Sequence, residues 1–119
     1  MRNLSIAILD GNLVRDPEMK KTRTNKTVTT FTVALNHEWG SKEGNNAVSY
    51  IQVEVWEKLA ETCAEYLKKG RHVLVEGNLR QDRWQDDRGE SRSRLKVVAH
   101  SVRFMGARSQ GREEGADAA

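Results

Sequence analysis

The 119-residue sequence predicts a single, mostly β-sheet domain with one helix. Two observations lead to this prediction. Five segments have the alternating or β-branched composition of strands, and only one segment has the apolar repeat of an amphipathic helix. The predicted order is three strands, the helix and two further strands. A parallel sheet built from strand–helix–strand units is excluded, because it would need several helices.

The first strand is expected between Leu4 and Val14. A glycine at position 11 interrupts it, which suggests a bulge or the close approach of another backbone. Its start is apolar on both faces, with Leu4, Ile6 and Ile8 on one and Ala7 and Leu9 on the other. One apolar face is enough for a core, so we expect the second to pack on a neighbouring subunit. The alternative is a strand buried on both sides within one domain.

The next two strands follow a polar, basic segment, residues 18–27, which is expected to be a loop. Residues 28–35 are β-branched and alternate, as in a half-buried strand. Residues 48–56 carry an aliphatic face of Ile51, Val53 and Val55. Because side chains alternate along a strand, the opposite face presents Tyr50, Gln52, Glu54 and Trp56. The aromatic residues of this strand are therefore expected on the face that the core does not use.

Residues 57–69 are predicted to form the helix, with Leu59, Cys63, Tyr66 and Leu67 as one apolar stripe. Gly70 fits the position just after a helix end. Cys63 lies in the stripe and is expected to be a core residue.

Strands are expected at residues 73–79 and 95–105, with a hairpin tip at Asp86–Asp87–Arg88–Gly89. This order matches a five-stranded OB-fold barrel with its helix between strands 3 and 4. The glycines in the strands suit the curvature that closes a barrel. We expect one folded domain over residues 1–106 and a short, flexible tail over residues 107–119.

Composition limits the function classes. A single Cys excludes an internal disulfide and a Cys-based zinc site. The apolar run at residues 6–9 is too short for a signal peptide or a membrane span, so a cytoplasmic, non-membrane protein is expected. The net charge is +3, and positive residues cluster within residues 20–26 and 80–96. Such clusters suit a polyanionic partner.

No pattern indicates catalysis. His37, His72 and His100 lie in different elements without metal-ligand spacing, and no phosphate-binding loop or nucleophile motif is present. The acid pairs at residues 86–87 and 113–114 fall in a hairpin tip and a tail, where acid–base chemistry lacks a shielded pocket. We therefore expect no enzyme activity, no metal and no cofactor.

The aromatic residues point to a different function. Trp39 and Trp56 end two predicted strands, and Trp84 lies in a hairpin arm among Arg80, Arg83 and Arg88. Single-stranded nucleic acid needs flat aromatic surfaces for its bases and cations for its phosphates. The interleaving of these residue types predicts such a binding surface. Phosphate contacts are expected from seven cations: Arg15, Lys20, Arg23, Lys58, Arg80, Arg83 and Arg88.

Several motifs in one order make the sequence resemble the bacterial single-stranded DNA-binding protein family. They are Ile8–Leu13 followed by Asp16–Pro17–Glu18, Phe31-x-Val33–Ala34, Trp39, Lys58–Leu59–Ala60–Glu61, Tyr66–Leu67-x-Lys69–Gly70, Val75–Glu76–Gly77-x-Leu79–Arg80 and Trp84. The resemblance covers about residues 3–106. It implies a homotetramer of OB folds that wraps single-stranded DNA without sequence preference in replication, recombination and repair. Family stacking positions fall on Trp39, Tyr50, Trp56 and Trp84.

The sequence departs from the family at three places. Ile51 stands where some members have a His that supports subunit assembly, and Asp10 replaces a hydrophobic residue. The final residues lack the acidic tip closed by Pro-Phe that recruits repair and replication enzymes, so recruitment by that route is not expected.

Two other functions compete with this one. An OB-fold RNA-binding protein would use a similar surface, because discrimination through the 2′-hydroxyl leaves no sequence signature here. A nuclease would need a cluster of carboxylates or histidines on one element, which the sequence lacks.

Overall fold

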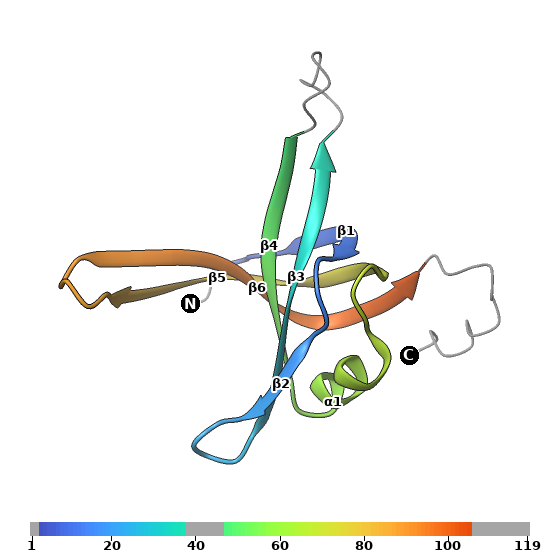
Figure 1. Cartoon of the computed structure of the whole chain (residues 1–119), viewed down its shortest axis with the longest axis horizontal. Coiled ribbons are helices and arrows are strands. Elements are labelled where there is room, and N and C mark those ends of the chain that lie inside the picture. The colour runs from blue at the N-terminus through green and yellow to red at the C-terminus, as the bar shows by residue number, and fades with distance from the viewer. Residues whose placement is uncertain (1–2, 38–46, 106–119) are drawn as a thin grey trace.

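The computed structural model describes residues 3–37 and 47–105. These residues form six strands and one helix (Figure 1). In chain order the elements are β1 (Ala7–Leu13), β2 (Glu18–Lys21), β3 (Thr27–His37), β4 (Ala47–Trp56), α1 (Glu57–Tyr66), β5 (His72–Gln85) and β6 (Ser91–Met105). The predicted positions of Trp39 and of the tail, residues 107–119, lie outside the described residues.

Five of the strands form a closed ring. The sheet order is β1–β5–β6–β4–β3–β2, and an additional pairing of β1 with β3 joins the two sides. β4 and β6 run parallel, and the other pairs are antiparallel. Within the described residues, β2 pairs with β3 alone and lies outside the ring. The β5–β6 pair continues beyond the ring as a long two-stranded arm (Figure 1), here called the β5–β6 arm, residues 79–95.

The ring is filled by small β-branched side chains. Val33, Val53, Val55, Val73 and Val75 are all fully buried, and each comes from an alternate position of its strand. β-Branched residues pack well on a pleated surface, so this core follows directly from the alternation seen in the sequence.

Helix α1 packs on the ring through Ala60 and Cys63, which are both fully buried. The hydroxyl of Thr29, in β3, donates a hydrogen bond of 2.8 Å to the carbonyl of Ala60. Burial raises the pKa of the Cys63 thiol to about 12, so the thiol stays protonated at neutral pH. The prediction that Cys63 is a core residue is confirmed.

Two glycines allow the strands to approach closely. A Cβ atom at Gly11 would lie 2.3 Å from the carbonyl oxygen of Ala34, and one at Gly77 would lie 2.2 Å from that of Val98. The register also shifts between Glu76 and Gly77, as in a β-bulge. The predicted role of Gly11, close backbone approach, is confirmed.

Two predicted boundaries were wrong. The segment 18–27 contains β2 (Glu18–Lys21) rather than only a loop, so the helix follows the fourth strand instead of the third. All four β2 residues are exposed, and a strand without a buried face has no hydrophobic alternation to reveal it. The helix ends at Tyr66 instead of residue 69, because Leu67 is extended and buried, with its N–H donating to Cys63.

Gly70 serves a turn after the helix instead of its end. It has φ +89°, and the Arg71 N–H donates to the carbonyl of Lys68 across the turn. The hairpin prediction was accurate at its tip: Gly89 has φ +79° and its N–H donates to the Asp86 carbonyl. Both arm strands extend much further than the sequence predicted. Their residues are polar on both faces, so no hydrophobic alternation indicated the extra length.

The backbone is strained at the first residue of α1, and relief of this strain should stabilise the fold. Glu57 has φ +53°, a left-handed conformation that costs an L-residue about 1–2 kcal/mol and costs glycine nothing. Its ion pair with Lys26 is 3.8 Å long and exposed, so it is worth little. Glu57→Gly should therefore raise the free energy of unfolding by about 1 kcal/mol, measured by urea denaturation.

The matched control is Glu61→Gly, an exposed position inside the same helix. There glycine should lower the free energy of unfolding by about 1 kcal/mol. A loss of stability in both variants would contradict the strain assigned to Glu57.

Candidate nucleic-acid interface

One outward face spans the three central strands of the sheet. Residues opposite one another in neighbouring strands point to the same side. Gln52 of β4 is opposite Lys96 of β6, and Lys96 is opposite Arg80 of β5. Alternation then fixes the remaining members. The set, here called the outer face, comprises Tyr50, Gln52, Glu54 and Trp56 on β4, Arg80, Asp82 and Trp84 on β5, and Arg92, Arg94 and Lys96 on β6.

Three of the four predicted stacking residues lie on the outer face. Tyr50 is 64% exposed and Trp84 is 43% exposed, whereas Trp56 is half-buried. The guanidinium of Arg94 lies 5.4 Å from the centre of the Trp84 ring, as in a cation–π contact. One side of that ring is thus covered by a cation, and exposed indole surface is left for a base.

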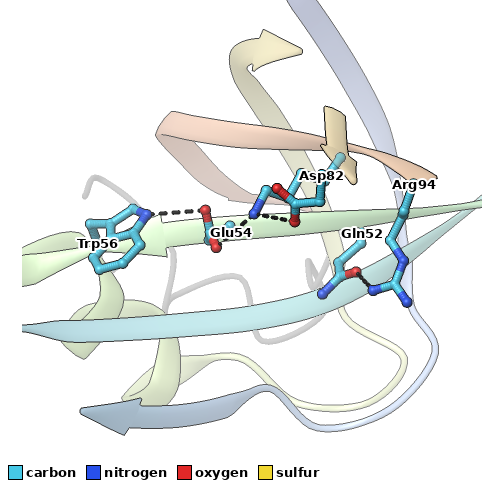
Figure 2. A network of polar contacts seen from close by, with 6 residues as sticks. Gln52, Glu54, Trp56, Asp82 and Arg94 are labelled. Atoms are coloured by element: carbon cyan, nitrogen blue, oxygen red, sulfur yellow. Dashed lines mark hydrogen bonds and ion pairs between the residues drawn. The ribbon is translucent and has the colours of Figure 1, made fainter. Parts of the chain in front are cut away.

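A polar network begins at Trp56 and continues along the outer face (Figure 2). The Lys96 ammonium contacts the Glu54 carboxylate at 3.0 Å and the Asp82 carboxylate at 2.8 Å. The indole N–H of Trp56 donates to the other oxygen of Glu54, at 3.2 Å. Lys96 is only 7% exposed, and buried charges of this kind need such partners.

The ionisation of the network follows from these contacts. The hydrogen bond from Lys96 lowers the pKa of Asp82 below its usual value. Burial by itself lowers the pKa of Lys96, but its hydrogen bonds to Asp82 and Glu54 outweigh burial and raise that pKa. Lys96 and Asp82 therefore both stay charged at neutral pH.

The seven predicted phosphate-contact residues are all exposed, but they lie in different places. Arg80 is on the outer face. Lys20 of β2 is opposite Val28 of β3, and Val28 is opposite Trp56 of β4, so Lys20 lies two strands away from Trp56. Arg15 lines a pocket of about 200 Å³ together with Thr30, Thr32 and Gln52, which places it beside the outer face. Lys58 follows Trp56 closely, in the first turn of α1.

Two arginines lie elsewhere on the β5–β6 arm, and Arg23 lies in the turn between β2 and β3. Arg83 alternates with Trp84 and points to the other side of the arm, where its Nε donates to Gln81. Arg88 lies in the hairpin turn. That turn is held by Asp86, whose carboxylate accepts from the backbone N–H groups of Arg88 and Glu90 and from the Arg92 side chain.

Four further members of the outer face carry no contact predicted from the sequence: Gln52, Arg92, Arg94 and Lys96. Arg92 and Arg94 share a side of the arm with Trp84 only because of the cross-strand register, in which Trp84 is opposite Arg92 and Asp82 is opposite Arg94. This register follows from the five-residue connection between Gln85 and Ser91. The turn motif Asp86–Gly89 was the sequence signal from which the register could have been predicted.

Within residues 3–37 and 47–105, no three His, Cys, Asp or Glu side chains gather in a way that could hold a metal ion. The helix found among the described residues is too short and polar to cross a membrane.

Comparisons with known proteins identify relatives of the whole described region. A model of the single-strand binding protein family matches residues 4–105. The single-stranded DNA-binding protein of Caldanaerobacter subterraneus subsp. tengcongensis is 42% identical over 106 residues, which cover 89% of this chain and 71% of the relative. That of Thermotoga maritima is 42% identical over 100 residues, with 82% and 71% covered.

A solved structure confirms the predicted fold. The Plasmodium falciparum SSB in complex with ssDNA superposes with a TM-score of 0.79 and 22% identity, over 88% of this chain and 97% of that one. The family resemblance inferred from the motifs is confirmed by the family model, which matches nearly every described residue. The chain belongs to the single-strand binding protein family.

Proposed function

We propose that the chain binds single-stranded DNA without sequence preference and protects it during replication, recombination and repair. Bases stack on Trp39, Tyr50, Trp56 and Trp84, and phosphates contact the surrounding cations. The main support is the strand register, which gathers Tyr50, Trp56 and Trp84 with Arg80 and Arg94 on one outer face. The relatives named single-stranded DNA-binding protein, and a structural neighbour in complex with ssDNA, support the same assignment.

The chemistry of the outer face accounts for the lack of sequence preference. Every base has an aromatic face, so stacking on an indole or phenol accepts all four. Arginine and lysine contact the phosphates, which carry no sequence information. We propose no catalytic activity and no cofactor for the chain, and a strand-cleavage assay with added magnesium checks that absence.

RNA binding is the alternative function, because stacking and phosphate contacts also suit RNA. Titration of the chain with matched oligo-dT and oligo-U, followed by intrinsic tryptophan fluorescence, separates the two. DNA binding predicts strong quenching and the tighter affinity for oligo-dT. Tighter binding of oligo-U would favour the RNA-binding alternative.

We also propose that the chain acts in the cytoplasm as a homotetramer. Leu4, Ile6 and Ile8 lie on one side of the chain leading into and along β1, and they are 85%, 64% and 59% exposed. Their neighbours Ala7 and Leu9 pack against the core on the other side. Among the described residues, one side of this segment is therefore left exposed, and a second copy of the chain would cover it. Several subunits on one strand would also raise the overall affinity.

Removal of the Trp84 side chain should weaken DNA binding without unfolding the chain, because the residue lies on the exposed β5–β6 arm. Trp84→Ala should cost about 1–3 kcal/mol of binding free energy, measured by anisotropy of a labelled oligo-dT. Tyr66→Ala is the control, since Tyr66 is similarly exposed but lies near Phe104, away from the outer face. Equal affinities of Trp84→Ala and the parent chain would contradict the stacking role.

Neutralising arm arginines should flatten the salt dependence of binding. The logarithm of the affinity falls with the logarithm of the salt concentration by about 0.7 per neutralised phosphate on single strands. Arg80→Gln and Arg83→Gln should each reduce that slope by about this amount, equally for oligo-dT and mixed sequences. Lys68→Gln, an exposed cation after α1, should leave the slope unchanged. A loss that depends on sequence would instead indicate readout of base edges.

A charge on the exposed side of β1 should disrupt assembly. Ile8→Lys leaves the core intact, because the side chain is exposed in the single chain, but it would bury a charge between subunits. Light scattering should show a mass below that of the parent oligomer. Lys58→Glu, a charge change on the exposed side of α1, should leave the mass unchanged. A monomeric parent chain would refute the tetramer, whatever the variants show.

A further inference from the structure

We propose that Glu54, anchored by Lys96, is a positioning residue that fixes the indole of Trp56 for stacking on the outer face. This inference rests on the proposed function. It concerns a residue that itself stacks on no base and repels phosphates. Figure 2 shows the arrangement, with the Trp56 ring on one side of Glu54 and Asp82 on the other side of the network.

The contacts require a carboxylate at position 54. One oxygen of Glu54 accepts from the indole N–H at 3.2 Å, and the other accepts from the Lys96 ammonium at 3.0 Å. Both partners are pure donors, so both oxygens must be acceptors. A glutamine would offer one acceptor and would place an NH2 group against the remaining donor. The ammonium, as the stronger donor, would keep the amide oxygen, and the indole would lose its partner.

Burial makes this anchor rigid. The side chains of Lys96 and Glu54 are only 9% and 13% exposed, whereas that of Asp82 is 46% exposed. The Glu54–Lys96 pair is thus shielded from the solvent that weakens surface ion pairs. Lys96 also joins Asp82 of the β5–β6 arm to Glu54 of β4. Two of the proposed stacking elements, Trp56 on β4 and the arm that carries Trp84, are therefore held by one ammonium group.

The charge of Glu54 and its proposed positioning role predict opposite effects of a mutation on DNA binding. A carboxylate on a surface that binds a polyanion is electrostatically unfavourable, so Glu54→Gln should strengthen DNA binding if only charge matters. If Glu54 positions Trp56, the same variant should weaken binding. The sign of the change decides between the two.

The experiment is a double-mutant cycle between Glu54→Gln and Trp56→Phe. Phenylalanine keeps an aromatic ring but has no N–H to donate. We expect Glu54→Gln to weaken oligo-dT binding by about threefold to tenfold, the range of one net hydrogen bond. In the Trp56→Phe background the same substitution should cause no loss. Asp87→Asn, which removes an exposed acid of the arm tip outside the network, is the charge-matched control and should not weaken binding.

A second readout follows the indole directly. In a chain whose sole tryptophan is Trp56, made by Trp39→Phe and Trp84→Phe, fluorescence anisotropy decay of the unbound protein should report faster indole rotation after Glu54→Gln. Adding Lys96→Met removes the competing donor, frees the amide oxygen for the indole and should restore slow rotation. This measurement needs no DNA, so it stands even if Glu54→Gln proves less stable in the binding assay.

The outcomes separate failure of this inference from failure of the proposed function. No quenching of the parent chain by oligo-dT would refute the function itself. If the parent binds and Glu54→Gln binds equally or more tightly, the positioning role is overturned. A loss of the same size in the Trp56→Phe background would also overturn it, because Glu54 would then act on binding through something other than the indole.

Discussion

The contact between β1 and β3 is the constraint on which the rest of the molecule depends. It closes five strands into a ring, through the pairs Asn12–Ala34 and Leu13–Val33, and it is allowed because Gly11 has no Cβ to meet the Ala34 carbonyl. Once the ring is closed, each strand residue points either into a valine-filled interior or outward. The core therefore selects the outer face: Val53 and Val55 point inward, so Gln52, Glu54 and Trp56 point outward. A side chain larger than hydrogen at Gly11 would disturb the core and the outer face together.

The outer face contains carboxylates and a buried ammonium that would each be energetically unfavourable without an oppositely charged partner. Glu54 and Asp82 lie among cations that suit a phosphate chain, and Lys96 lies between the two carboxylates. Its ammonium is nearly inaccessible, so it contributes to the internal order of the face more than to contact with a ligand. The exposed arginines are the cations proposed to contact phosphates, while the buried lysine keeps the carboxylates paired. Burying a charge pair gives little net stability, and the arrangement is better explained by the geometry that it imposes on Trp56 and on the β5–β6 arm.

The sequence predicted most of the fold and part of the site, for physical reasons that differ between elements. Strands with a buried face, such as β3 and β4, show their alternation directly, and the stripe of Leu59 and Cys63 identified the helix. β2 and the full length of the two arm strands were missed because all of β2 and most of the arm are exposed, which leaves no hydrophobic pattern to detect. The outward placement of Tyr50 and Trp56 on β4 followed from alternation within one strand. The roles of Arg94 and Lys96 depend on register between strands, which arises from the turn at Asp86 and from the parallel pairing of β4 with β6.

That parallel pairing also explains why the outer face can act as one surface. β4 and β6 are far apart in sequence, and three residue pairs join them, Gln52–Lys96, Val53–Val97 and Glu54–Val98. Two of these pairs involve the outer face, and side-chain contacts reinforce both. Arg94 donates to Gln52 at 2.6 Å, and Lys96 donates to Glu54. The backbone pairing of β4 with β6 covers three residue pairs, and the side-chain contacts extend this link toward the arm. The cross-strand contacts tie β4 to β6 close to Trp56 and at the base of the arm that carries Trp84. The polar network therefore links β4 of the ring to the β5–β6 arm on the outer face, between Trp56 and the strand that carries Trp84.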